Sequence, residues 1–366
     1  MKTRSKILYA ASTAQHLRRF HTPYIEALKK NNDVYLMATE GDGIDFPVSF
    51  AKSFFSLQNF KSIRKIRSIL KTERFDQIIV HTTLAAFLIR AATVGLKKRP
   101  RLINVVHGYL FSMPIKGIKS HILLLCEKLM KNRTDALAVM NREDLLIAQK
   151  YRLTKGTVSF IKGMGVDFST EGVKRQEELR ERYVSPNGFL CTFVGELSSR
   201  KNQIFLIRGI HALRQQGIPA SLLLLGEGSE REHLEAEIER LDLKNYVFLE
   251  GNREPVLPYL AATDLYISAS VSEGLPFNVM EAMSLGLPVL LSDTKGQNDL
   301  MGTNGQLLYP LNATDSFCKR VKEVYEKKEW GIGQCEYPAL EQYRLQNVFE
   351  ENIKIFLMEE SNEDQA

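Results

Sequence analysis

The sequence predicts two parallel α/β units in tandem. Short runs of β-branched and other apolar residues alternate with helical patterns through the first half of the 366-residue chain, and the alternation starts again after a polar stretch at residues 170–178. Strands and helices that alternate in this way form βαβ units with parallel strands. The length agrees with two domains, because single hydrophobic cores stop growing beyond about 250–300 residues.

Each predicted strand is a short apolar run, and each predicted helix repeats apolar residues every three or four positions. In the first unit, strands are expected at residues 6–10, 33–37, 77–81, 101–107, 136–140 and 157–161, and helices at 15–31, 57–73, 84–96, 118–133 and 141–151. In the second unit, strands are expected at 189–194, 221–226, 246–249, 265–268 and 288–292, and helices at 203–216, 229–241, 255–262 and 278–285.

A last amphipathic helix is expected at residues 345–358. We therefore divide the chain into domains 1–167 and 168–340, followed by a helix and tail, 341–366, that would pack back on the first domain. Ligands bind open α/β sheets at the carboxyl ends of the strands. Functional residues are therefore expected just after strands in both domains.

Composition and charge narrow the classes of protein. The four cysteines, which stand apart from one another, form no C-x-x-C pair, so neither a zinc site nor a disulfide framework is indicated and a cytoplasmic location is expected. No apolar stretch reaches the roughly 20 residues of a membrane-spanning helix. Residues 1–165 hold 29 Lys and Arg against 11 Asp and Glu, whereas the rest hold 20 against 32.

This charge asymmetry suggests different partners for the two halves. A basic half suits an anionic membrane surface, and the basic amphipathic stretches at 61–67 and 118–133 suit a peripheral position on the inner face of the plasma membrane. A solvated basic surface without a partner is the alternative interpretation. Nucleic acid is not expected as a partner, because aromatic residues do not interleave with the basic runs.

One candidate site follows the strand predicted at 265–268. Glu273 and Glu281 are separated by seven residues, and the amides of Leu275 to Val279 would lie at a helix N-terminus, where the dipole and unpaired N–H groups favour an anion. Carboxylates accept hydrogen bonds from sugar hydroxyls, so this segment suits a sugar next to a phosphate. A capped helix with two unrelated solvated glutamates is the alternative.

A second loop follows the strand predicted at 189–194. Gly195 allows the backbone to turn close to a ligand, and Lys201 stands where a helix begins. The strand end Gly226-Glu227-Gly228 is a third candidate, although so short a glycine pattern is more often a turn.

Together these segments resemble glycosyltransferase family 4, the retaining transferases with the GT-B fold. The resemblance runs from about residue 6 to residue 356 and is most similar to bacterial capsule and exopolysaccharide transferases. The matching patches, in chain order, are His107-Gly108, Asn141 with Asp144, residues 163–167, Gly195 with Lys201-Asn202, Gly226-Glu227-Gly228, Glu273 with Glu281, and residues 303–308.

The resemblance implies a GT-B architecture, in which two Rossmann-like parallel-sheet domains, one for the acceptor and one for the nucleotide sugar, face a central cleft. It implies catalytic roles for His107, which would reach the donor sugar, and Glu273, which would orient it. The implied donor-binding residues are Gly195, Arg200, Lys201, Arg253, Leu275, Pro276, Phe277, Asn278 and Glu281.

Two departures from the family pattern stand out. Glu196 occupies the place where many relatives carry an arginine after the glycine, and Arg200 is the expected replacement. The first strand is followed by Ala11, Ser12 and Thr13, the implied acceptor-binding residues, instead of a Gly-Gly loop.

The resemblance implies that a hexose or N-acetylhexosamine passes, with retention, from a nucleotide diphosphate sugar to a lipid-linked or polysaccharide acceptor. A UDP-sugar is the expected donor, and no metal cofactor is expected. Two alternatives remain, a UDP-sugar epimerase of the same fold and a non-catalytic partner subunit of a transferase.

Overall fold

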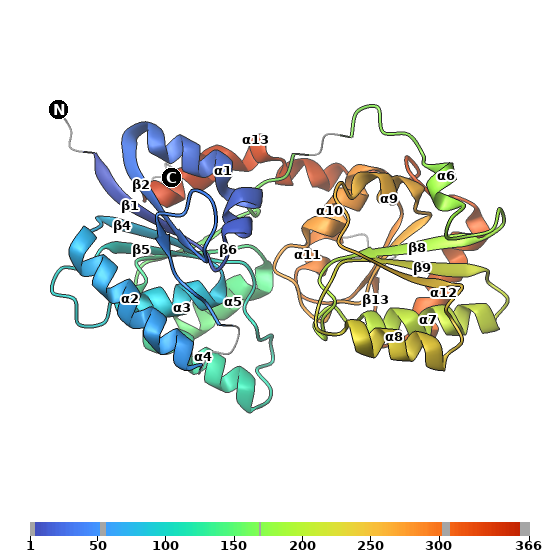
Figure 1. Ribbon diagram of the computed structural model, residues 1–366, viewed down its shortest axis with the longest axis horizontal. Coiled ribbons are helices and arrows are strands. Elements are labelled where there is room, and N and C mark those ends of the chain that lie inside the picture. Colours follow the sequence, from blue (N-terminus) through green and yellow to red (C-terminus); the bar gives the residue numbers. More distant parts are fainter. Residues whose placement is uncertain (1–3, 52–55, 168–169, 302–307, 359–366) are drawn as a thin grey trace. The chain divides into compact units, whose positions relative to one another are not determined.

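The computed structural model describes residues 4–51, 56–167, 170–301 and 308–358. The chain forms two compact units: Met1–Val166 with Gln342–Ala366 make the first, and Asp167–Glu341 make the second (Figure 1). Residues 303–307, which contributed to the family resemblance, lie outside the described residues.

The first unit is built on a seven-stranded parallel sheet. Its strand order is β3-β2-β1-β4-β5-β6-β7, and all the pairings are parallel. The strands are β1 (Ser5–Ala10), β2 (Asn32–Ala38), β3 (Phe46–Pro47), β4 (Gln77–His81), β5 (Arg101–Val106), β6 (Ala136–Val139) and β7 (Thr157–Phe160). β3 was not predicted from the sequence, since two residues give no periodicity.

Crossovers between parallel strands are right-handed, so the direction of each crossover decides which face its helix covers. The helices α2, α3, α4 and α5 all connect strands in one direction along the sheet and share one face, whereas α1 lies on the other (Figure 1). The helices of this unit are α1 (Ala14–Asn31), α2 (Leu57–Glu73), α3 (Thr83–Ala92), α4 (Ile118–Met130), α5 (Arg142–Tyr151) and α13 (Leu345–Leu357).

Several predicted boundaries were wrong by a few residues. The helix predicted to reach residue 96 ends at Ala92, because the Thr93 hydroxyl donates to the Arg90 carbonyl at 2.7 Å and Gly95 adopts a left-handed φ of 74°. The helix predicted to reach residue 133 ends at Met130 and continues as a short 3-10 turn. β5 ends before His107, which places this histidine in the following loop.

The C-terminal helix α13 belongs to the first unit, where it packs against α1. The rings of Tyr24 and Phe349 stack with centroids 5.1 Å apart, and the Asn352 side-chain amide donates to the Tyr24 hydroxyl at 2.9 Å and to the Gly163 carbonyl at 2.8 Å. A Cβ on Gly165 would lie 2.5 Å from the Leu345 Cα. The glycines at 163–165 therefore allow α13 to approach closely.

The second unit contains a six-stranded parallel sheet in the order β10-β9-β8-β11-β12-β13. Its strands are β8 (Phe189–Val194), β9 (Ala220–Leu225), β10 (Val247–Gly251), β11 (Leu265–Ser268), β12 (Val289–Ser292) and β13 (Leu308–Tyr309). Its helices are α6 (Glu177–Arg180), α7 (Gln203–Gln215), α8 (Arg231–Arg240), α9 (Leu257–Ala262), α10 (Phe277–Ser284), α11 (Gln297–Met301) and α12 (Thr314–Lys327), with a 3-10 helix at Pro338–Tyr343. The predicted fold class, two parallel α/β units, is confirmed.

Helix α12 was not predicted because its buried stripe is narrow. Only Phe317, Cys318 and Val321 of its residues are buried, while most of the rest are polar. A Cβ on Gly209 of α7 would lie 2.5 Å from the Phe317 ring, so the two helices approach closely at that glycine. α7, α8 and α12 share one face of the sheet, and α9 and α10 cover the other (Figure 1).

Candidate functional site

In each sheet the chain leaves the central pair of strands in opposite directions, which defines a topological switch point. In the second unit this point lies between β8 and β11, and in the first unit between β1 and β4. The predicted residues at 195–201 and 272–273 follow β8 and β11, and those at 11–13 follow β1. These predicted residues therefore lie at the sheet edges where ligands of such folds bind.

At the switch point of the second unit, Glu273 lies between two basic side chains. The Lys201 Nζ is 2.6 Å from Oε1 of Glu273, and the Arg200 Nη1 is 2.9 Å from Oε2. The Arg200 side chain is 43% exposed, whereas those of Lys201 and Glu273 are 10% and 8% exposed. A nearly buried ion pair is therefore capped on one side by a solvent-facing guanidinium.

The environment sets the charges of this cluster. Burial lowers the pKa of Lys201, and the neighbouring Glu273 carboxylate opposes that shift. Burial by itself would raise the pKa of Glu273, but Lys201 and Arg200 outweigh it and hold that pKa below its usual value. Glu273 is thus ionised near neutral pH, where its carboxylate neutralises cations that would otherwise attract an anion.

Glycines allow the loops after β8 and β9 to touch through their backbones. A Cβ on Gly226 would lie 2.0 Å from the Gly195 carbonyl oxygen, and one on Gly228 would lie 2.1 Å from the Leu197 carbonyl oxygen. Gly195 itself has a φ of 152°, and its amide donates to the Leu225 carbonyl at 2.8 Å. Gly226 and Gly228 therefore shape the edge that carries Lys201.

The start of α10 differs in detail from the sequence prediction. Pro276 has no N–H, so it cannot contribute to an anion-binding group of amides. The amide of Val279 donates to the Pro276 carbonyl at 3.2 Å. Pro276 and Val279 therefore do not belong to an anion-binding group of amides in this turn.

The Asn278 side chain has a structural role. Its amide donates to the Tyr266 hydroxyl at 2.7 Å and also to the Val194 carbonyl, which ties α10 to β8 and β11. Glu281 lies on the same helix and is partly buried.

Sequence reasoning missed Lys295, which is 6% exposed and follows β12. Its carbonyl accepts the Glu273 amide at 3.0 Å, and a Cβ on Gly296 would lie 2.6 Å from the Glu273 carbonyl oxygen. The loop after β12 therefore supports the backbone of Glu273. A polar run directly after a predicted strand was the available signal, because that position marks the functional edge of the sheet.

Two other residues face solvent. Arg253 is 46% exposed on its side chain and pairs with Glu250 at 2.7 Å. Glu196, the departure from the family pattern, is exposed and acts electrostatically to raise the pKa of Lys201. It therefore adds negative charge to an edge that would otherwise be strongly basic.

In the first unit, the residues after β1 lie at the carboxyl edge of the sheet. Ala11 is fully buried, the Thr13 hydroxyl caps α1 by accepting the His16 amide at 3.2 Å, and the Ser12 hydroxyl lies 2.6 Å from that of Thr82. Thr82 has a φ of 68°, an unusual conformation for a β-branched residue. Residues with strained backbone conformations of this kind cluster at functional sites.

His107 follows β5 in a loop that a buried polar network holds. The Asp144 carboxylate accepts the Tyr109 amide at 3.1 Å and the Asn141 side-chain amide at 2.7 Å. Gly108 has a φ of 110°, which explains the glycine in the His107-Gly108 motif. Asn141 and Asp144, which also contributed to the resemblance, therefore position the His107 loop.

His107 does not stand alone, which the sequence analysis missed. Its Nε2 lies 3.1 Å from Nδ1 of His81, and the rings of His16 and His21 lie 4.9 and 5.8 Å away between centroids. These three histidines lie on α1 and at the end of β4, so no local spacing in the sequence signals the cluster. The position of His81 at a strand end was the only available hint.

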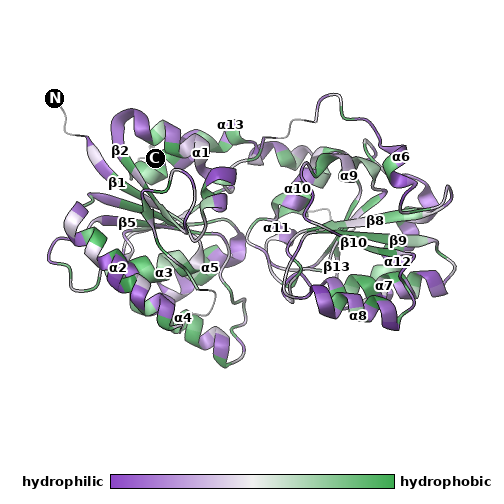
Figure 2. Cartoon of the chain, viewed as in Figure 1, coloured by the Kyte–Doolittle hydropathy of each residue, from purple (hydrophilic) through white to green (hydrophobic). Residues whose placement is uncertain are grey.

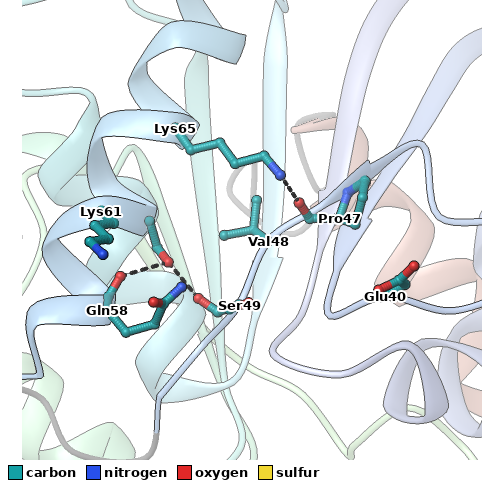
Figure 3. A pocket seen from close by; sticks show the side chains of 8 residues that line it. Glu40, Pro47, Val48, Ser49, Gln58, Lys61 and Lys65 are labelled. Atoms are coloured by element: carbon teal, nitrogen blue, oxygen red, sulfur yellow. Dashed lines mark hydrogen bonds between the residues drawn. The ribbon is translucent and has the colours of Figure 1, made fainter.

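A basic hollow opens beside β3 and the start of α2 (Figure 3). Lys61 and Lys65 line it from the helix, and Glu40 and Ser49 line it from the loops after β2 and β3. The Lys65 ammonium donates to the Pro47 carbonyl at 2.6 Å. This hollow adds a mixed surface with two lysines and one glutamate to the first unit.

Two parallel-sheet units, each with a topological switch point, correspond to one class of known structures. The fold is similar to a crystal structure of Anabaena Alr3699/HepE in complex with UDP and glucose, with a TM-score of 0.76, 17% identity, and coverage of 97% of this chain and 100% of that chain. The architecture is therefore the GT-B fold.

Sequence comparison shows what the chain is similar to. The model described as glycosyl transferases group 1 matches residues 188–327. The chain is 27% identical over 340 residues to the "Putative glycosyltransferase EpsD" of Bacillus subtilis, covering 88% of each. It is 25% identical over 294 residues to the UDP-Gal:alpha-D-GlcNAc-diphosphoundecaprenol alpha-1,3-galactosyltransferase of Escherichia coli, covering 78% of this chain and 76% of that protein. The protein is therefore a glycosyltransferase, as the sequence resemblance predicted, and its residues 188–327 are similar to the group 1 family.

Proposed function

We propose that this protein is a retaining family 4 transferase that moves a hexose or N-acetylhexosamine from a UDP-sugar to a lipid-linked glycan during capsule, exopolysaccharide or O-antigen assembly. The observation that carries the proposal is the Arg200–Glu273–Lys201 cluster at the switch point of the second unit. A diphosphate can replace the Glu273 carboxylate as the partner of both cations.

An exchange of ionic partners would let the carboxyl edge of the second sheet bind both the diphosphate and the sugar of the donor. When a diphosphate arrives, Lys201 and Arg200 turn to its oxygens and free Glu273 to accept hydrogen bonds from the sugar. Glu281, further along α10, would hold the ribose. A UDP donor is supported by the Anabaena relative of the same fold, whose complex contains UDP and glucose.

The chemistry of the transfer follows from these charges. Lys201, Arg200 and the amides of Leu275 and Phe277 would stabilise the negative charge that develops on the leaving diphosphate. The acceptor hydroxyl would attack from the same face, and its proton would pass to the departing phosphate. Glu273 would orient the sugar rather than attack it, and a covalently trapped sugar on Glu273 would contradict this step.

His107 would contribute from the first unit, since it lies in a loop at the carboxyl edge of the sheet. The hydroxyls of Ser12 and Thr82 lie at the same edge, and we assign this edge to the acceptor. An acceptor carrying a diphosphate-linked lipid agrees with the substrate in the name of the Escherichia coli relative.

The surface of the first unit supports a membrane-bound acceptor. Helix α4 exposes an apolar stripe at spacings of four, three and four residues, which lies along one side of the helix. The stripe consists of Ile118, Ile122, Leu125 and Leu129, of which Ile118 is 81% exposed. Apolar and hydrophilic residues alternate around α4 (Figure 2).

Basic residues flank this stripe. Lys119, Lys128 and Lys131 lie on or just after α4, and α2 on the same face of the sheet adds exposed Leu57 and Phe60 next to Lys61. Apolar side chains with flanking cations suit an anionic lipid surface. None of the described helices is long and apolar enough to cross a membrane.

The donor site is tested by calorimetric titration of UDP and GDP into the full chain and into the Lys201→Ala and Glu281→Ala variants. We expect UDP to bind the wild type and to bind both variants at least tenfold more weakly. Lys244→Ala, a solvent-exposed lysine of the same unit, serves as the control and should bind normally. Absence of nucleotide binding to the wild type would favour the non-catalytic partner subunit instead.

A functional assay separates transfer from epimerisation. UDP-sugars are incubated with the protein in EDTA, with and without a polyprenyl-diphosphate-linked acceptor. Release of UDP that depends on the acceptor is expected, with retention at the transferred carbon. Conversion of one UDP-sugar into another without an acceptor would contradict the proposal.

The membrane surface is tested by flotation with vesicles that contain anionic lipid. A variant carrying Ile118→Ser, Leu125→Ser and Leu129→Ser should bind at least tenfold more weakly, because each apolar side chain buried in the interface contributes about 1.5–3 kcal/mol. Serine replacements of exposed Val94 and Leu146, which lie outside the α4 stripe, form the control. Equal binding of all three proteins would remove α4 as the contact surface.

A further inference from the structure

The histidine cluster of the first unit has a feature that sugar transfer does not explain. Four of the seven histidines in the chain gather there, His16 and His21 from α1, His81 from the end of β4, and His107 from the loop after β5. The rings of His21 and His81 lie 4.0 Å apart, and those of His16 and His21 lie 4.9 Å apart. Ligand nitrogens of His16, His21 and His107 all lie within 4.8 Å of one another.

Several nitrogens of this cluster are buried without a partner. Among the described residues, Nε2 of His16, of His21 and of His81 has no hydrogen-bond partner. An unpaired buried polar atom costs about 1–3 kcal/mol, so three of them together require an explanation. A metal ion bound by His16 and His21 would satisfy two of these atoms at once, because neutral imidazole offers a lone pair.

A contact outside the cluster orients one of its rings. The Tyr9 hydroxyl lies 3.0 Å from Nδ1 of His21 and orients that ring with Nε2 directed away from it. Outer contacts of this kind fix the ligand nitrogen of metal-binding histidines.

We propose that His16, His21 and His107 bind a divalent transition-metal ion such as Zn²⁺, and that the bound ion inhibits the transferase by sequestering His107. All three ligands are imidazoles, a donor set that suits Zn²⁺, Cu²⁺ or Ni²⁺ rather than Mg²⁺ or Ca²⁺. Tetrahedral zinc places its nitrogen ligands about 3.3 Å apart, so ring rotations close the remaining gap.

His81 completes the arrangement. Its Nδ1 contacts Nε2 of His107 at 3.1 Å, so it can hold His107 as an outer partner. His16 and His107 are partly exposed, which gives an ion a route into the cluster. The metal site stands on the geometry alone, whereas its inhibitory effect rests on the role proposed for His107.

The site is tested with the full chain, freed of any affinity tag, by titration of Zn²⁺ against a chromophoric chelator and by the absorption spectrum of added Co²⁺. We expect one equivalent of Zn²⁺ and a tetrahedral Co²⁺ spectrum. His16→Asn and His21→Asn should weaken Zn²⁺ binding by about 100-fold, since even loss of an outer partner costs 10–100-fold. His121→Asn, an exposed histidine of the same unit outside the cluster, should bind as the wild type.

His16 is partly exposed, so His16→Asn keeps the test usable if His21→Asn fails to fold, as circular dichroism would show. Wild-type protein without a stoichiometric site, or equal loss in His121→Asn, would overturn the metal site. Stoichiometric Zn²⁺ that leaves acceptor-dependent transfer unchanged would overturn the inhibition. UDP binding to the second unit is measured in the same samples, so failure of the donor site remains distinguishable.

Discussion

The switch point of the second unit is lined by charges that neutralise one another, whereas that of the first unit is lined by neutral imidazoles with unpaired nitrogens. Lys201 and Glu273 form a nearly buried ion pair, while His21 and His81 are buried with a free Nε2 each among the described residues. In the second unit, the Glu273 carboxylate pairs with the cations until an anion replaces it. In the first unit, the neutral imidazoles offer lone pairs to a proton, a substrate hydroxyl or a metal ion.

The largest expected effect comes from breaking the ion pair. Lys201→Met should lower kcat/KM for transfer about 1,000-fold, because one preorganised group that stabilises a developing negative charge contributes 10²–10³-fold and UDP binding is lost as well. It should also destabilise the second unit by about 3 kcal/mol, since it leaves Glu273 buried beside Arg200 alone. Steady-state kinetics and urea unfolding measure the two effects, with Lys244→Met as the control.

His107 should separate catalysis from donor binding. His107→Asn should lower the transfer rate about 100-fold, the usual contribution of a positioned polar catalytic group. UDP affinity should stay within about twofold, because the cations assigned to the diphosphate lie in the second unit. A parallel loss of UDP binding in calorimetry would show that donor binding is not confined to the sheet edge of the second unit.

As the pH falls, the first unit should lose stability at a higher pH than the second unit. The pKa of His16 is about 4 in the fold against 6.5 when unfolded, so the unfolded chain binds more protons in this range and stability falls as pH drops from about 6.5 to 4. His16 alone corresponds to about 3 kcal/mol. The pKa of Glu273 is lowered, so its contribution is lost only below the usual glutamate range.

Hydrogen exchange followed by mass spectrometry between pH 8 and pH 4 measures this order. Amides around β1 and β4 should lose protection at a higher pH than those around β8 and β11, and His16→Asn should flatten the first transition. Simultaneous loss in both units would argue that the histidines do not control acid stability.

The smallest effect is expected from the exposed Glu196. Glu196→Arg replaces a negative charge near Lys201 by a positive one and should tighten UDP binding about fivefold, as a change of surface charge contributes on the order of 1 kcal/mol. Glu239→Arg, which makes the same charge change at the end of α8, should leave UDP binding as it is. Weaker UDP binding in Glu196→Arg would show that the glutamate has a role in the donor site.

Local sequence determined the two parallel units, because strand and helix periodicity reports which residues face a core. It also placed Gly195, Lys201 and Glu273 correctly after strands, since these positions depend only on element boundaries. His107 was expected at the end of a strand and lies in the loop after β5. Narrow or two-residue elements such as α12 and β13 escaped prediction because they bury too few residues to produce a pattern.

Tertiary structure alone decided which side chains meet. Lys201 and Glu273 are 72 residues apart and come together only because β8 and β11 are neighbours in the sheet. The neighbouring positions of β1, β4 and β5 likewise bring His16, His81 and His107 together. The Asn278 side chain forms hydrogen bonds with residues of both β8 and β11. Pairing across crossovers depends on strand order, which local periodicity does not encode.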